Sequence, residues 1–116
     1  FTYIDDIVEG VLRCCDKPAT TNPDFDPLQP DPATAAAPHR VFNIGNSQPV
    51  ELLQFIEVME QELGCKAVKD LQPMQPGDVV ATAADTTALK RWIDFQPSTT
   101  LECGIPRFVQ WYQNFY

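Results

Sequence analysis

The sequence has 116 residues, of which 44% are hydrophobic and 21% are charged, and its formal net charge is -8. Length and composition predict one globular domain with a single small core. A surface of this sign repels phosphate backbones and anionic lipid headgroups, so nucleic acid and membranes are excluded as expected partners. A small molecule or another protein remains as the expected partner.

The first expected elements are a short strand and a helix. Residues 1–4 are apolar and favour a strand, and from Ile4 to Cys15 apolar side chains recur with the period of a helix whose N-cap is Asp5 or Asp6. Residues 18–38 hold six prolines and three aspartates and have no periodicity. This composition predicts a mobile, solvated loop inserted in the domain.

A second strand and helix are expected after the loop. Residues 40–46 read RVFNIGN, which predicts a buried strand ending in a turn, and a helical stripe follows from Leu52 to Leu63, ended by Gly64. A further β-like run covers 67–72.

Two more helices are expected towards the C-terminus. One follows Asp85 as its cap, and the last starts at Thr99 or Thr100, with Glu102 placed for a capping box. Pro106 predicts a kink there or a later start of the helix. We therefore expect an α/β fold with short strands and about four helices.

The cysteines and the ends of the chain bear on its compartment. Cys14, Cys15, Cys65 and Cys103 show no C-x-x-C spacing, so we expect no metal site and interpret them as reduced packing residues. No apolar run is long enough to span a membrane, and the start lacks a basic signal region. These features predict a cytoplasmic protein, and the missing initiator methionine suggests a piece of a longer one.

Motifs for catalysis are absent. The five glycines form no G-x-G-x-x-G or P-loop pattern, and there is no Tyr-x-x-x-Lys pair. His39 has no acid or nucleophile at a catalytic spacing and is expected to be a plain loop histidine. We therefore expect no catalytic, metal-ligating or cofactor-binding residue in this chain.

Four blocks of sequence in a fixed order carry a family resemblance. They are FTYIDDIVEG at 1–10, APHRVFNIGNS at 37–47, MQPGDVVATAADTTAL at 74–89 and FQPSTTLECGIPRFVQWY at 95–112. Together they resemble the C-terminal part of NAD-dependent nucleotide-sugar epimerases of the extended short-chain dehydrogenase family, most closely the UDP-glucuronate 4-epimerase branch. The resemblance covers residues 1–116.

The resemblance implies the C-terminal substrate-binding region of an extended Rossmann-type enzyme. In that family an N-terminal Rossmann domain holds NAD and the Tyr-Lys pair, and the C-terminal region binds the UDP-sugar. The implied parent reaction is C4 epimerisation of UDP-glucuronate to UDP-galacturonate, and the chain alone is expected to be inactive. With its Rossmann domain missing, it is also expected to self-associate through bare apolar faces.

Three residues are the expected substrate contacts. Gln75-Pro76-Gly77-Asp78 predicts a type II turn, which alone explains these residues, but the resemblance also gives Asp78 the ribose hydroxyls as partners. At Gln75 many relatives carry a phosphate-binding arginine, and glutamine offers donors without charge. Thr82 stands where relatives place a sugar contact.

Other notable residues have structural interpretations. Asn43 and Asn46 are expected to serve the turn around Gly45, and Trp92, Trp111 and Tyr112 are expected to pack in the core. Two alternatives to an epimerase part stay open: a small non-catalytic protein-interaction module, and a fragment of a related nucleotide-sugar dehydratase.

Overall fold

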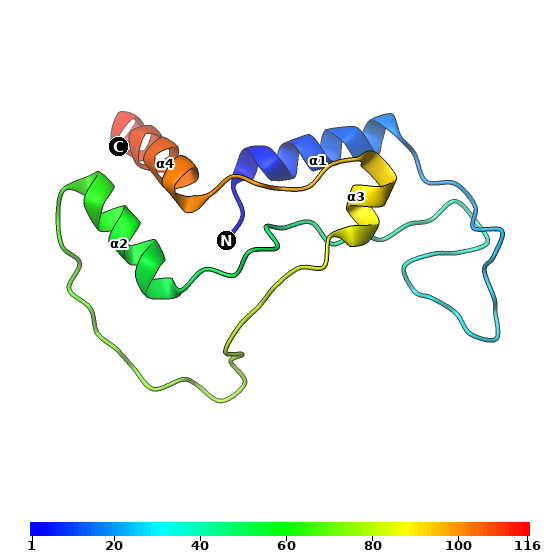
Figure 1. Ribbon diagram of the computed structural model, residues 1–116, viewed down its shortest axis with the longest axis horizontal. Helices are drawn as coiled ribbons and strands as arrows, with labels where there is room; N and C mark the ends of the chain where they lie inside the picture. The colour runs from blue at the N-terminus through cyan, green and yellow to red at the C-terminus, as the bar shows by residue number, and fades with distance from the viewer.

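The computed structural model describes residues 1–116 and contains four helices: α1 (Ile4–Asp16), α2 (Leu52–Leu63), α3 (Thr87–Ile93) and α4 (Leu101–Phe115). The helices form two pairs, α1 with α3 and α2 with α4. Figure 1 shows the pairs side by side, joined by irregular segments, with residues 17–40 projecting beyond α3 and residues 64–84 forming an arc on the side of α2. No helix has the length and apolar character needed to cross a bilayer.

The expected strands do not form. Residues 1–3, 40–46 and 67–72 belong to no β-ladder, and the only bridge in the chain is an antiparallel pairing of Thr34 with Arg40. A strand exists only where a second one satisfies its backbone donors and acceptors. The apolar, β-branched sequence of these segments suits a sheet, but the chain supplies them with no neighbouring strand.

The helix boundaries follow the capping signals in part. Gly64 ends α2 with a φ of 67°, a left-handed conformation that glycine adopts readily. Asp85 lies before α3, and its Oδ1 accepts a hydrogen bond from the Thr87 amide at 2.9 Å. The capping box expected at α4 is absent, because Thr100 is the N-cap and its side chain makes no cap bond. The helix continues through Pro106.

Asp6 does not cap α1, contrary to expectation. The helix starts at Ile4 with Tyr3 as N-cap, so Asp6 already lies in its first turn. Its carboxylate instead accepts hydrogen bonds from the Ser98 amide at 3.1 Å and from the amide and hydroxyl of Thr99, both at 2.9 Å. This side chain thus fastens the segment before α4 to the start of the chain.

The buried core is small. Its apolar members are Leu89 and Ile93 of α3 and Ile105 and Val109 of α4. The radius of gyration is 18.7 Å, against about 13 Å for a compact domain of this length. The apolar stripe of α1 is largely exposed, at Ile4, Val8, Val11 and Leu12. The chain therefore buries much less apolar surface than its composition would allow.

Several side chains expected in the core lie at the surface. Trp111 and Tyr112 are about half exposed, and Trp92 is half-buried between the cations of Lys17 and Arg40, at 4.8 and 5.6 Å from its ring centre. The four cysteines are free thiols; Cys14 is half-buried, but Cys15, Cys65 and Cys103 are exposed, so the interpretation of these three as packing residues was wrong. The aromatic residues and the cysteines are exposed for the same reason: the helices have too few neighbouring elements to cover their surfaces.

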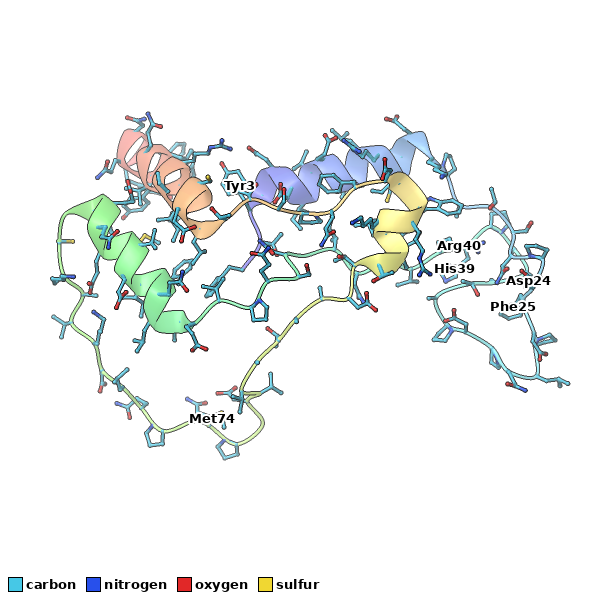
Figure 2. All side chains as sticks on the ribbon, in the orientation of Figure 1. Tyr3, Asp24, Phe25, His39, Arg40 and Met74 are labelled. Carbon is cyan, nitrogen blue, oxygen red and sulfur yellow. The ribbon has the colours of Figure 1, made fainter.

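The proline-rich loop is closed at its neck. The amides of Asn22 and Val41 donate to the carbonyls of Ala35 and Ala33, both at 3.0 Å. Farther out, side chains of Asn22, Asp26 and Asp31 accept bonds from amides two residues ahead, which are local turns. Figure 2 shows Asp24 and Phe25 far out on this loop, with His39 and Arg40 nearer to α3.

A buried carboxylate holds the start of the arc. The Glu60 side chain, on α2, is 4% exposed and accepts hydrogen bonds from Lys66 Nζ at 2.7 Å, from the Ala67 amide at 3.0 Å and from Lys69 Nζ. We call these four residues the Glu60 clasp. Hydrogen bonds from Lys66 and Lys69 are the main reason that the pKa of Glu60 falls from 4.5 to about 2.

The clasp should open in acid. Because the folded pKa of Glu60 is depressed, its stabilisation is fully present above pH 4.5 and is lost as the pH falls towards about 2. The charged groups around it are Lys66 and Lys69, with Glu57 acting on Lys66. We expect the amide resonance of Ala67 to titrate with a midpoint near 2, and Glu60→Gln to abolish that titration. A midpoint of about 4.5 would show that the clasp does not form.

Candidate substrate-binding segment

The sequence Gln75-Pro76-Gly77-Asp78 forms the expected turn. The Asp78 amide donates to the Gln75 carbonyl at 3.1 Å, and Gly77 has a φ of 97°. Proline at the second position and a positive φ at the third are the features of a type II turn. The Asp78 carboxylate is exposed and makes no hydrogen bond within the chain, so both of its oxygens are available to hydroxyl donors.

All three expected contact residues lie on one exposed stretch. Gln75, Asp78 and Thr82 are exposed, as is every residue from 61 to 83. In Figure 2 Met74, the residue before Gln75, lies at the outer bend of the arc, far from Tyr3 at the start of α1. The three residues thus lie on one segment of the chain, and this segment is not packed against a helix.

A cavity lies elsewhere in the chain. It lies between α2, α4 and the N-terminal residues, has a volume of about 550 Å³, and contains none of the three expected contacts. Phe1 stacks on Phe55 at 4.2 Å in its wall, and Gln54 and Glu102 are among its polar residues. The volume falls in the range of ligand pockets.

The Glu102 carboxylate in this cavity is held in its ionised form. Hydrogen bonds from its own backbone amide, and then from Thr100, lower its pKa. A second, more polar hollow of about 500 Å³ lies beside α3, with Asp85, Lys90 and Arg91 in its wall. Hydrogen bonds from the Thr87 side chain and amide lower the pKa of Asp85, so this acid too serves local structure.

The arginines are engaged away from the turn. Arg13 pairs with Glu9 at 2.6 Å and donates to the Asp94 carbonyl, and Arg40 donates to the carbonyls of His39 and Thr21. Arg107 lies over the ring of Tyr3, and Arg91 lines the hollow beside α3. None of these four guanidinium groups contacts the Gln75–Asp78 turn.

The Glu60 clasp was missed from sequence. The sequence does contain a signal for it. Glu60 is an acid next to Met59, a residue of the apolar stripe of α2, and two lysines follow shortly after Gly64, where the helix ends. The turn role expected of Asn46 is confirmed, because its Oδ1 accepts from the Gln48 amide at 3.0 Å, and its Nδ2 also donates to the Thr99 carbonyl. No group of three His, Cys, Asp or Glu side chains is arranged to hold a metal ion.

Comparison with known proteins gives relatives over the whole chain. Protein CapI of Staphylococcus aureus is 47% identical over 116 residues, which are all of this chain and 35% of that protein. The probable UDP-glucuronate 4-epimerase of Rhizobium meliloti (strain 1021) is 41% identical over 117 residues, again across the whole chain and 34% of its own length. The chain is a homologue of the C-terminal part of UDP-glucuronate 4-epimerases.

A solved structure agrees in fold. The crystal structure of a UDP-glucuronic acid 4-epimerase Y149F mutant from Bacillus cereus, in complex with UDP-4-deoxy-4-fluoro-glucuronic acid and NAD, matches with a TM-score of 0.73 and 23% identity. The match covers 100% of this chain and 32% of that one, and at this identity it shows the fold alone. No family model matches the sequence.

The homologous region is a minor part of each relative. The chain spans about a third of the length of the two relatives described above. It therefore corresponds to the C-terminal part of a Rossmann-type epimerase fold, seen here as four helices and their connections. The resemblance expected from the four sequence blocks is confirmed.

Proposed function

We propose that this chain is the nucleotide-sugar-binding part of an NAD-dependent epimerase that interconverts UDP-glucuronate and UDP-galacturonate. The observation that carries the proposal is the alignment across the whole chain with the probable UDP-glucuronate 4-epimerase of Rhizobium meliloti (strain 1021), at 41% identity. The rigid turn supports it, because Asp78 presents an unpaired carboxylate to solvent, as a ribose contact requires. Gln75 and Thr82 complete the proposed contact set.

The reaction itself needs groups that this chain does not hold. Its glycines do not fit NAD, since the space beside Gly10 is filled by Ile44 and Phe95 and that beside Gly104 by Tyr3, leaving no glycine-rich cradle. The crystal structure from Bacillus cereus contains NAD, so we infer that NAD is the cofactor of the longer protein, where it would accept and return the hydride at C4. The residues proposed here bind and orient the substrate.

A charge-neutral variant tests the ribose contact. Asp78→Asn keeps the size of the side chain but removes the charge that strengthens two hydrogen bonds, so the affinity for UDP should fall about tenfold. Asp70→Asn is the matched control, because Asp70 is exposed on the same arc and makes no hydrogen bond. Titration of UDP followed by amide shifts measures both. Equal affinities for Asp78→Asn and Asp70→Asn would refute the role of Asp78.

We also infer that the isolated chain self-associates. The exposed stripe of α1 at Ile4, Val8, Val11 and Leu12 is the kind of apolar face that soluble monomers avoid. In the longer protein the preceding Rossmann domain would cover such faces. Sedimentation velocity across concentration should show a mass that rises with concentration, and Val8→Lys with Leu12→Glu should reduce it. A monomer at every concentration would contradict this inference.

The tip of the proline-rich loop is proposed to be its mobile part. The neck bonds of Asn22 and Val41 hold the base, and residues 23–31 make only local turns. Few long-range bonds oppose local opening there.

A further inference from the structure

We propose that Glu60, Lys66 and Lys69 are positioning residues, which fix where the Gln75–Asp78 turn stands relative to the helices and so tune substrate binding; this rests on the function proposed above. None of the three touches the expected contact residues. They act through the backbone of the arc that carries the turn.

The Glu60 clasp is the tether of this arc. Residues 65–83 are exposed throughout, and the hydrogen bonds that join them to the rest of the chain all end on the Glu60 carboxylate. The other hydrogen bond in this stretch, between Asp78 and Gln75, is internal to the turn. Without the clasp the arc would be attached only at its two ends, Gly64 and Ala84.

Gly64 makes the clasp possible. Its left-handed conformation, with a φ of 67°, turns the chain sharply as α2 ends, so that residues 66–69 run back past Glu60. A residue with a side chain would be strained there. The clasp then holds the arc at Ala67 and Lys69, which shortens the untethered part from residues 65–83 to residues 70–83.

Because Glu60 is buried, its carboxylate depends on its hydrogen-bond partners within the chain. The Glu60 side chain is 4% exposed. A buried carboxylate that loses its hydrogen-bond partners destabilises the folded state. Lys69 is the better-placed lysine, because its side chain is 34% exposed, whereas that of Lys66 is 82% exposed. Removal of Lys69 should therefore loosen the arc more than removal of Lys66.

The length of chain between the clasp and the turn limits how far the turn can move. Gln75 lies six residues beyond Lys69, a contour of at most about 20 Å, and freeing Lys69 moves the effective anchor back to Ala67, whose amide still donates to Glu60. The turn would then explore a larger volume. Its own geometry would persist, since Pro76, Gly77 and the Gln75–Asp78 bond are local. A contact residue on a looser segment costs more entropy to order on binding.

The test compares three variants of the whole chain. Lys69→Met removes the clasp bond nearest to the turn with little change in side-chain volume, and Lys69→Arg can restore that bond. Lys90→Met, on α3, is the control for loss of one exposed lysine. The first readout is the backbone ¹⁵N heteronuclear NOE of residues 72–82. We expect Lys69→Met to lower it by roughly half, Lys69→Arg to keep the original value and Lys90→Met to leave it unchanged.

The second readout is the affinity for UDP in the same samples. Lys69→Met should weaken binding about fivefold and Lys69→Arg should not. Unchanged NOE values in Lys69→Met, or equal losses in the methionine and arginine variants, would overturn the positioning role. If the unaltered chain does not bind UDP at all, the proposed function fails, and the NOE comparison still decides whether the clasp positions the turn.

Discussion

Replacing Asp6 with alanine should lower the free energy of unfolding by roughly 3 kcal/mol. The carboxylate accepts three hydrogen bonds, from the Ser98 amide and from the amide and hydroxyl of Thr99, and alanine leaves all three donors without this partner. These bonds join α1 to the segment before α4, so their loss should also separate the two helix pairs. Urea denaturation followed by circular dichroism measures the change.

Asp5→Ala is the matched control for this change. Asp5 lies in the same first turn of α1, is exposed, and makes no side-chain hydrogen bond. Its removal should change the free energy of unfolding by less than about 0.5 kcal/mol. Similar losses for the two variants would show that Asp6 contributes only through the charge at the start of α1.

Leu89→Ala should have an effect of similar size, about 3 kcal/mol. Leu89 is 2% exposed and is the most buried large side chain of the protein. In a core with so few apolar members, little surrounding structure is available to close the cavity that the truncation leaves. Thermal unfolding measures this loss of stability. The protein concentration is kept fixed, because self-association raises the apparent stability in a concentration-dependent way.

The same truncation at Leu28 provides the comparison. Leu28 is 89% exposed on the proline-rich loop, so Leu28→Ala removes the same atoms without opening a cavity. We expect its unfolding temperature to match that of the unaltered chain. If Leu28→Ala were as destabilising as Leu89→Ala, the packing described for α3 would be wrong.

The helices could be predicted from sequence because their signals are local. The apolar period and the Gly64 stop are contained within each segment, and α2 ends at the expected residue. The strands could not, because pairing depends on a partner elsewhere in the chain, and only Thr34 and Arg40 form a bridge. The exposed positions of Val8 and Trp111 have the same origin, since periodicity identifies an apolar face but not what covers it.

The candidate site was predictable only in its turn. Pro76 and Gly77 encode a backbone geometry over four residues, and the structure contains it. The Glu60 clasp joins residues on the two sides of a helix end, and the bonds of Asp6 span 92 and 93 residues. Such contacts depend on how the chain folds back on itself, which no local spacing specifies.

We propose that residues 74–82 bind the nucleotide-sugar without a cation for the diphosphate. Titration of the chain with UDP-glucuronate, followed residue by residue through amide shifts, tests it most directly. We predict shifts centred on Gln75, Asp78 and Thr82, with a dissociation constant of about 1 mM, because no arginine is placed at the turn. Shifts confined to the cavity between α2 and α4, with residues 74–82 unmoved, would contradict it.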